Sequence, residues 1–520
     1  MNKLVGKNIG STVGKILSKT VYIWEFLFSI IFALSMYILV TRKHYMGAIS
    51  KKYLLITIFA GGIVVGVMIY NILKNRKRLE SIFATFMIPI GLLYMIFMLP
   101  TYAPDEIQHI WKAYDVSQGN LFTRLDGENN SLGVDIPQVM TNATNVSLKK
   151  YSSLNELIKS KTDYNETINV ITPAQGYCFI FYIPTAIIFF LVRNLNISII
   201  IGIYLAKIWN FILFVLTGYY LIKKMPFGKY VIFTIMFLPM VIQQQVSLSA
   251  DAMINIGIFI YTVFTISLLY QKEKIGIKQK IIYMMLILFV SIAKMVYFPM
   301  IGLGFLLVSS KNMNKKDKYI ILGLGTILCI LLILINYKYT STIKTPSDME
   351  TIEKISGANA SEQVRYLIHN PINYFVMLKN TIKSNAGNYI DMMIGAKLGW
   401  LDINIPQIIT YIFIIMLAYS CIIEDNNVAF SCKEKIWTLV VSVGTILLIV
   451  TVTYILWTSV GAKTPSGVQG RYFIPVLPLA LLSLSMKNNY IKIKNREIII
   501  PLVLLVLNIF VVNSIFEFFI

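Results

Sequence analysis

The chain has few charged residues and few side chains of the kinds that build soluble catalytic or metal centres. Charged residues make up 14% of its 520 residues, and it has 25 acidic residues, 4 cysteines and 3 histidines. The cysteines have no metal-ligand or redox spacing. Neither a Gly-x-x-x-x-Gly-Lys-Ser/Thr loop nor a glycine-rich dinucleotide fingerprint is present. The sequence therefore does not support direct use of a nucleotide or a cysteine-based metal site.

Apolar residues dominate instead. They make up 56% of the chain and recur in runs long enough to cross a bilayer, which takes about 20 residues per helix. A membrane β-barrel would show shorter segments of alternating polarity. The sequence predicts an all-α polytopic membrane protein with about 12 or 13 transmembrane helices. No internal repeat is evident, which disfavours common transporter plans.

The net charge of +22 comes from lysine and arginine in short connectors between apolar runs. The strongest is Lys74-Asn75-Arg76-Lys77-Arg78, and such connectors are typical of the cytoplasmic side. We therefore expect membrane lipids, and no nucleic acid, as partners. The run Ser81 to Pro100 then crosses outward and places residues 101–175 outside.

The apolar runs divide the chain into three regions. Residues 1–80 hold a signal anchor, Val21 to Val40, which lacks a cleavage site, and a second span, Tyr53 to Leu73. Residues 81–485 form the central module, with two larger outer segments, 101–175 and 336–405. Residues 486–520 hold a basic connector, which includes residues 487–492, and a last span.

The path of three stretches of the central module through the membrane follows from the connectors beside them. A full crossing by residues 176–192 would put the basic connector 223–229 outside, so we expect this segment to be re-entrant or to lie on the membrane surface. Residues 230–246 are expected to cross as one helix. Residues 281–308 lie between basic connectors, one of them with Lys311, so they are expected to form a hairpin with Lys294 near its outer tip.

The acidic pair Asp105-Glu106 opens the first outer segment, directly after a span. Ile107, Ile110, Trp111 and Tyr114 follow at helical spacing, which predicts a short amphipathic helix along the membrane surface. His109 and Lys112 would share a face with Asp105. Adjacent carboxylates can take a proton from a hydroxyl or hold a divalent cation such as Mg or Mn, with Glu106 and His109 as candidate ligands. The alternative is that the pair only complements the helix dipole.

Four further ionisable residues lie at expected outer membrane edges. Asp251 ends the polar run that begins Gln243-Gln244-Gln245, and acids at such positions are candidate functional groups. Lys294 can hold a lipid phosphate or pair with Asp251. Arg471 can clamp a phosphate with two hydrogen bonds or extend to the headgroups. Asp402 lies in a compact turn, where it can be a cap or a ligand.

Six short stretches together resemble the bacterial predicted membrane proteins filed as domain of unknown function 2142. In chain order they are Pro104-Asp105-Glu106 with His109, Ser249-Ala250-Asp251 with Asn255, Ala293-Lys294 with Tyr297 and Pro299, Arg365-Tyr366 with Asn370-Pro371, Gly399-Trp400-Leu401-Asp402, and Gln469-Gly470-Arg471-Tyr472-Phe473-Ile474-Pro475. The resemblance covers residues 80 to 485. The two extra N-terminal spans depart from the pattern and need not touch a site.

That family is similar to the GT-C glycosyltransferases, and the similarity implies a GT-C-like helix bundle in the plasma membrane. It implies transfer of a sugar from a polyprenyl-phosphate donor to an extracytoplasmic glycan or lipid acceptor. Asp105 or Glu106 would be the catalytic base or a metal ligand. The substrates would be bound by His109, Lys112, Asp251, Lys294, Asp402, Arg471 and Tyr472.

Two other functions remain open from the sequence. A transporter or flippase of a lipid-linked glycan could line its path with the same charges, and a membrane scaffold for envelope assembly could carry a degenerate site. A transporter predicts ionisable residues through the depth of the bilayer. The expectation tested most directly by a structure is that Asp105, Asp251, Lys294 and Arg471 converge on one outer cavity that is continuous with lipid.

Overall fold

A computed structural model describes residues 2–122, 133–144, 150–151, 154, 158, 161–309, 312–342, 357–424, 428–486 and 493–520. The described chain is mainly helical, with two two-stranded antiparallel pairs. Lys311 and residues 487–492, both expected in basic connectors, lie outside the described residues. The expectation of an all-α polytopic membrane protein is confirmed.

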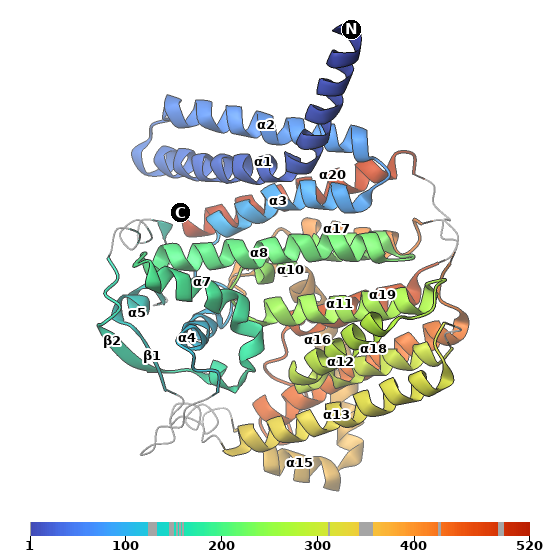
Figure 1. Ribbon diagram of the computed structural model, residues 1–520. Helices are drawn as coiled ribbons and strands as arrows, with labels where there is room; N and C mark the ends of the chain where they lie inside the picture. The colour runs from blue at the N-terminus through green and yellow to red at the C-terminus, as the bar shows by residue number, and fades with distance from the viewer. Residues whose placement is uncertain are drawn as a thin grey trace.

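Seven described helices are long and apolar enough to cross a membrane. They are α1 (Asn2–Met46, apolar from Val21), α2 (Lys51–Asn75), α3 (Leu79–Phe97), α8 (Ile199–Lys224), α11 (Ala250–Tyr270), α18 (Cys432–Trp457) and α20 (Arg496–Phe519). In Figure 1, α3 packs between α8 and α20. The α1–α2 hairpin covers the side of α3 that faces away from α8. These helices give the bundle two ends, and α4 lies at one of them (Figure 1).

Four shorter apolar helical segments complete the bundle, at Phe179–Asn194, Met295–Val308, Gln407–Ser420 and Gly470–Leu484. The first comprises the 3₁₀ turn η2 (Phe179–Tyr182) and α7 (Ile183–Asn194), which has 12 residues. Together the two elements extend for ~26 Å, close to the ~30 Å hydrocarbon core. The expectation that residues 176–192 do not make a full crossing stays a prediction.

The expectation of a single helix over residues 230–246 is wrong. The chain forms α9 (Lys229–Met236), breaks at Phe237 and Leu238, and forms α10 (Pro239–Gln245). Pro239 explains the break, because proline has no N–H to continue the helical hydrogen bonds and clashes with the preceding turn. As a result, α10 ends inside the protein, with all its residues buried.

The hairpin expected over residues 281–308 is present. Helix α12 (Ile277–Ile292) ends at Ala293, and the 3₁₀ helix η3 (Met295–Ser309) starts two residues later. Lys294 lies at the bend between them. Helix α13 (Lys315–Thr342) follows and packs against α12 and η3.

The first outer segment is more compact than its sequence predicted. Its helix α4 (Glu106–Ser117) is present, but Ile110 and Tyr114 are 0% and 1% exposed, so the expectation that it lies on the membrane surface is wrong. It is covered by α7, by η1 (Pro173–Gly176), by η2 and by an unexpected strand pair, β1 (Gly133–Pro137) with β2 (Thr167–Ile171). The short helix α5 (Gln138–Thr144) completes this group (Figure 1).

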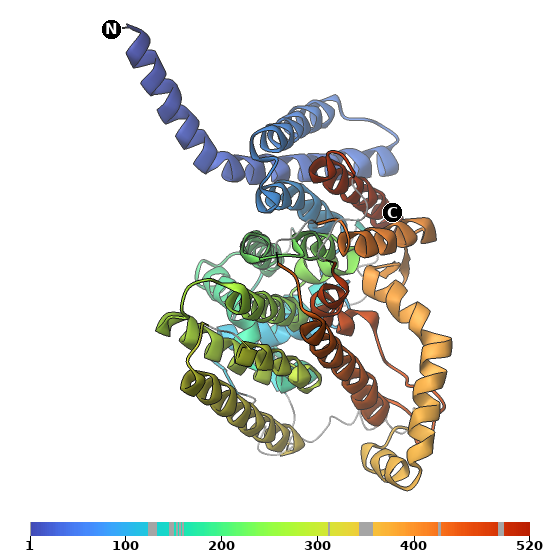
Figure 2. The ribbon, with the colours of Figure 1, turned by 90° about the vertical axis from the view of Figure 1, so that its right-hand side faces the viewer.

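The second outer segment forms an arm beside the bundle (Figure 2). Its elements are α15 (Ala360–His369), α16 (Pro371–Ile394), β3 (Lys397–Leu398) and β4 (Ile403–Asn404). The apolar helix α17 (Gln407–Ser420) follows this segment. The chain returns after α18 through η4 (Gly470–Val476) and α19 (Leu477–Leu484). Gly470 lets η4 touch α16, since a Cβ there would lie 2.3 Å from the Met393 nitrogen.

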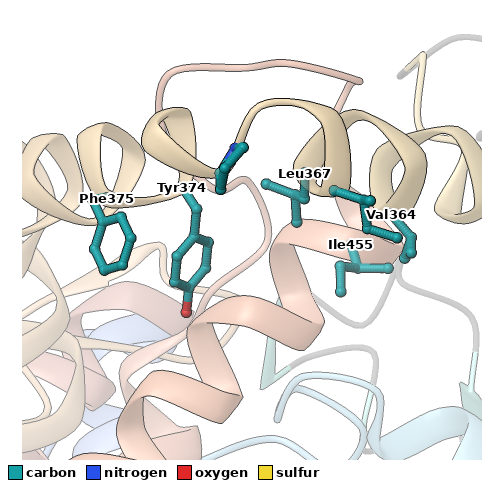
Figure 3. Close-up of a pocket in the computed structure, with 7 residues that line it drawn as sticks. Val364, Leu367, Tyr374, Phe375 and Ile455 are labelled. Carbon is teal, nitrogen blue, oxygen red and sulfur yellow. The ribbon is translucent and has the colours of Figure 1, made fainter.

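A pocket of about 290 Å³ lies between the arm and α18 (Figure 3). Its lining is apolar apart from the Tyr374 hydroxyl, which is 2.7 Å from Thr451 Oγ1 on α18. The lining residues are Val364, Leu367, Ile368, Pro371, Tyr374, Phe375 and Ile455. A surface of this composition suits hydrocarbon, and it includes no residue of the predicted site.

Candidate functional site

Four charged residues from distant parts of the chain meet at the α4 end of the bundle. Arg471 Nη2 is 2.6 Å from Asp105 Oδ2, and Lys294 Nζ is 2.6 Å from Asp251 Oδ1. Arg471 Nε, 4.0 Å from Asp251 Oδ2, joins the two pairs. We call these four residues the ion cluster. The convergence of the four residues is confirmed, and the further expectation that they line an outer cavity continuous with lipid stays a prediction.

Asp105 has an unusual backbone conformation. It precedes the first residue of α4 with φ at +61°, the left-handed region that side-chain-bearing residues seldom adopt. Arg471 stabilises this bend, because its Nη1 donates to the Pro104 carbonyl at 3.1 Å while its Nη2 holds the Asp105 carboxylate. Strained bends of this kind are common at functional sites.

Asp251 and Lys294 are positioned by helix ends. Asp251 is in the first turn of α11, where the helix dipole favours a negative charge, and Ser249 caps that turn by accepting from the Asp251 N–H at 3.2 Å. Lys294 extends from the bend between α12 and η3. The salt bridge to Asp251, one of the two roles expected for Lys294, is therefore present.

Aromatic rings surround the two cations. The Tyr472 ring centre lies 4.9 Å from Lys294 Nζ and 5.4 Å from Arg471 Cζ, and the Tyr177 ring lies 5.7 Å from Lys294 Nζ. Ring faces attract cations and replace part of their lost hydration. Tyr472 is itself held in place, since Tyr297 donates to its carbonyl at 3.0 Å.

Exposure differs sharply along the ion cluster. The Asp105 side chain is 42% exposed and that of Lys294 is 19% exposed, whereas Arg471 and Asp251 are 6% and 10% exposed. Asp105 is thus the member that an incoming polar molecule can reach. The two carboxylates and two cations balance, so the cluster as a whole is neutral.

His109 lies beside the ion cluster but does not join it. Its Nδ1 is 2.7 Å from the Tyr182 hydroxyl. Burial lowers its pKa to about 4, and the Lys294 and Arg471 charges act in the same direction against the opposing effect of Asp251 and Asp105. The imidazole is therefore neutral at pH 7, so it can polarise a substrate group only through a hydrogen bond.

Glu106 has a different environment from its neighbour Asp105. It is fully buried, and its Oε1 lies 2.9 Å from Lys207 Nζ of α8 and accepts from the Leu248 N–H at 2.9 Å. The pair ties α4 to α8 and to the loop before α11. The structure therefore does not support Glu106 as an accessible catalytic base or metal ligand.

Lys112 also points away from the ion cluster. Its side chain is 1% exposed, donates to Gln175 and lies 3.6 Å from Asp115. Gln175 in turn donates to Asp115 at 2.9 Å. This closed network links α4 to η1 and corrects the expectation that Asp105, His109 and Lys112 present one binding face.

Asp402 is held by Tyr102, three residues before Asp105. The Tyr102 hydroxyl donates to Asp402 Oδ2. Burial, reinforced by this hydrogen bond, raises the pKa of the Tyr102 hydroxyl, so it remains a donor. Asp402 therefore positions the chain that leads to Asp105, and within the described structure it forms no salt bridge with the ion cluster.

The residues do not fit a metal centre. Among the described residues, no group of three or more His, Cys, Asp and Glu side chains gathers as a metal site would require. Glu106 pairs with Lys207, and the cluster carboxylates pair with cations. No step below is assigned to a metal.

The opposite end of the bundle is basic. Hydrogen bonds tie its connectors together: Arg76 to Asn495, Gly228 N to Glu424 at 2.7 Å, Tyr270 to Glu434 at 2.8 Å, Lys435 to the Ser485 carbonyl at 2.6 Å, and Lys280 to Asp317. Helix α11 spans the distance, since its 21 residues run from Asp251 at the ion cluster to Tyr270 at this basic end. That length is ~31 Å, close to the bilayer core.

Several residues of the site were missed from the sequence. Lys207 lies within an apolar span, and an ionisable residue in such a span is the signal that could have identified it. Tyr177 and Tyr102 carried no signal, because aromatic residues are frequent in this chain and their roles depend on where the loops fold. The three adjacent glutamines of α10 were noted as polar but received no role.

Comparisons with curated proteins and with solved structures gave no match. The sequence model of one family, described as predicted membrane proteins (domain of unknown function 2142), matches residues 86–480. This range contains every member of the ion cluster and excludes the α1–α2 hairpin. A match over most of its length shows that the chain belongs to the family of predicted membrane proteins termed domain of unknown function 2142.

Proposed function

We propose that this membrane protein is a GT-C type glycosyltransferase that moves a sugar from a polyprenyl-phosphate donor to a hydroxyl of a cell-envelope glycan or lipid. The ion cluster carries the proposal. It combines an accessible carboxylate with two cations at one end of membrane-length helices. A lipid-borne phosphate and a water-borne hydroxyl can meet only at such a boundary.

The proposed reaction is a single displacement with inversion. Asp105 takes the proton of the acceptor hydroxyl, and the hydroxyl oxygen attacks the anomeric carbon of the sugar. The bond from that carbon to the phosphate oxygen breaks, and the phosphate leaves with the electron pair. Lys294 and Arg471 stabilise its growing charge, an effect that is strong where water is excluded.

The pairing of Asp105 with Arg471 gives the phosphate a second role in this mechanism. Arg471 holds the Asp105 carboxylate, with 2.6 Å between Nη2 and Oδ2. A donor phosphate that binds Arg471 competes with Asp105 for the guanidinium and frees the carboxylate to accept a hydrogen bond from the acceptor hydroxyl. Asp105 would thus become available as the base only when the donor phosphate is bound to Arg471.

The direct test is sugar transfer by the purified full-length protein in proteoliposomes. The donor is a short-chain polyprenyl phosphate with a radiolabelled hexose, and the acceptor is a lipid extract of the host envelope. We expect label in the acceptor with the wild type and background label with Arg471→Ala. Equal label with both proteins would refute the role of the ion cluster.

We further propose that the ion cluster faces outside the plasma membrane. The basic end matches the cytoplasmic side by the charge rule for connectors. The loop between α1 and α2 is an exception, since it lies at the other end and leads directly into Lys51 and Lys52, the first residues of α2.

Labelling with a membrane-impermeant maleimide tests this orientation in intact cells. Cys432, exposed at the basic end, should stay unlabelled until the cells are opened. A cysteine introduced by Glu166→Cys, at an exposed position beside β2, should label at once. The reverse pattern would place the site inside.

A flippase for the same lipid is favoured by one observation. Glu25 of α1 is fully buried within a candidate span, and neither of its carboxylate oxygens has a hydrogen-bond partner among the described residues. Buried carboxyls in spans often serve ion or substrate pathways. Movement of a fluorescent polyprenyl phosphate across proteoliposomes, lost in Glu25→Gln and kept in Asp105→Asn, would select this function over sugar transfer.

A further inference from the structure

Three consecutive glutamines of α10 are buried beside the ion cluster. Gln243, Gln244 and Gln245 are 0%, 4% and 1% exposed. Each has one amide atom bonded within the protein. Gln243 accepts from the Gly399 N–H at 2.8 Å, Gln244 accepts from Asn255 at 2.6 Å, and Gln245 donates to the Ala252 carbonyl at 3.3 Å.

The other amide atom of each glutamine is unpaired. Gln243 Nε2, Gln244 Nε2 and Gln245 Oε1 have no hydrogen-bond partner within the described protein, and neither has Gln469 Oε1. A buried polar atom left unpaired costs about 1–3 kcal/mol. Native proteins keep few such atoms, so a group of them calls for a polar partner, either ordered water or a bound ligand.

These amides adjoin the ion cluster. Asn255 lies one helical turn after Asp251 on α11, so both side chains are on the same face of the helix. Gln469 precedes Arg471 by two residues, and α10 packs against both α11 and η4. Along α11, Asn255 lies farther from the start of the helix than Asp251, which is in the first turn. We call Gln243, Gln244, Gln245, Asn255 and Gln469 the amide cluster.

The chemistry of the amide cluster selects its ligand. Amides offer both donors and acceptors without net charge, and each hydroxyl of a sugar needs one of each. A carboxylate or ammonium group would lose its hydration there without gaining an opposite charge, which is costly. Phosphate has its partners in the ion cluster next to it.

We propose that the amide cluster binds the hydroxyl groups of the sugar that is transferred, and that this sugar is uncharged. This inference rests on the proposed function and adds a substrate class to it. The donor would lie across both clusters, with its phosphate on Lys294 and Arg471 and its sugar ring against the glutamines.

Binding of three lipid probes to the full-length protein in nanodiscs tests the inference. The probes are decaprenyl phosphate alone, the same lipid carrying a neutral hexose, and the same lipid carrying a hexuronic acid. With the wild type, we expect the hexose to tighten binding at least about tenfold over the bare lipid, since each hydrogen bond contributes about three- to tenfold. The hexuronic acid should give no gain.

The hexose gain is the ratio by which the hexose tightens binding relative to the bare lipid. The variants Gln243→Met and Gln244→Met should each reduce this gain by about three- to tenfold and leave affinity for the bare lipid unchanged. Gln363→Met is the matched control. Gln363 is also fully buried and accepts from a backbone N–H, that of Gly461 at 2.9 Å, but it lies on α15. Gln363→Met should leave the hexose gain unchanged.

The outcomes separate the inference from the proposed function. A hexose gain that persists in the Gln243→Met/Gln244→Met double variant, as expected if these amides bind only water, would overturn the inference. An equal gain from the hexuronic acid would also overturn it. In both cases binding of the bare lipid would leave the proposed function standing. If no probe binds, the proposed function fails and the inference fails with it.

Discussion

Asp105 and Glu106 are adjacent in sequence and have opposite environments. The Asp105 side chain is 42% exposed and shares Arg471 with a second carboxylate, while the Glu106 side chain is 1% exposed in a closed pair with Lys207. The left-handed bend at Asp105 separates them. The Glu106 carboxylate is thus enclosed within the fold, whereas the Asp105 carboxylate is open to an incoming molecule.

The largest effect is expected from Asp105→Asn. This change removes the proposed base and keeps the size of the side chain. A positioned base typically contributes 10²–10⁴-fold, so transfer should fall by about that factor. The melting temperature should change little, because the exposed carboxylate contributes little to folding. Initial rates and thermal melting in detergent check both statements, and an unchanged rate would remove Asp105 as the base.

Glu106→Gln should have the reverse effect, with a large loss of stability. It leaves Lys207 charged and buried without a counter-charge, which costs about 3–5 kcal/mol. The matched variant is Glu106→Gln/Lys207→Met, which removes both charges and should recover most of the melting temperature. Chemical denaturation in detergent measures the difference. If the double variant is no more stable than the single one, the Glu106–Lys207 pair is not what holds Glu106 in place.

Arg471→Lys should have an intermediate effect. Lysine keeps the charge but cannot hold the Pro104 carbonyl and the Asp105 carboxylate together, as the two arginine nitrogens do. We expect KM for the donor to rise by about tenfold, equivalent to ~1.4 kcal/mol, with a smaller change in kcat. Steady-state kinetics with varied donor separate the two constants, and an unchanged KM would argue against phosphate binding by Arg471.

The smallest effect concerns pH. Burial lowers the pKa of His109 to about 4, whereas unfolded histidine has a pKa of about 6.5. Between these values the unfolded chain binds more protons, so the free energy of unfolding falls as pH drops below about 6.5 and is constant above it. From pH 6.5 to 5.5 the loss should be about 1 kcal/mol. His109→Gln should remove this slope in denaturation curves, and an identical slope in the variant would contradict it.

The helical membrane architecture followed from apolar runs and basic connectors. Where the chain breaks a segment that could have formed one helix, a particular feature of the sequence explains the break. Pro239 broke the expected span 230–246, and the bend at Lys294 was predicted because basic connectors flank both ends of residues 281–308. The burial of α4 could not be predicted, because the strands and turns that cover it come from residues far along the chain.

The sequence by itself determined the spans, the basic connectors and the polar residues near membrane edges. Each depends on local composition, because the bilayer imposes the same cost on every exposed polar group. Only the tertiary structure decided which charges meet. It paired Asp105 with Arg471 and Glu106 with Lys207, and it set three glutamines beside Asp251. Those contacts join residues up to 366 positions apart, and only the packing of the helices fixes their separation.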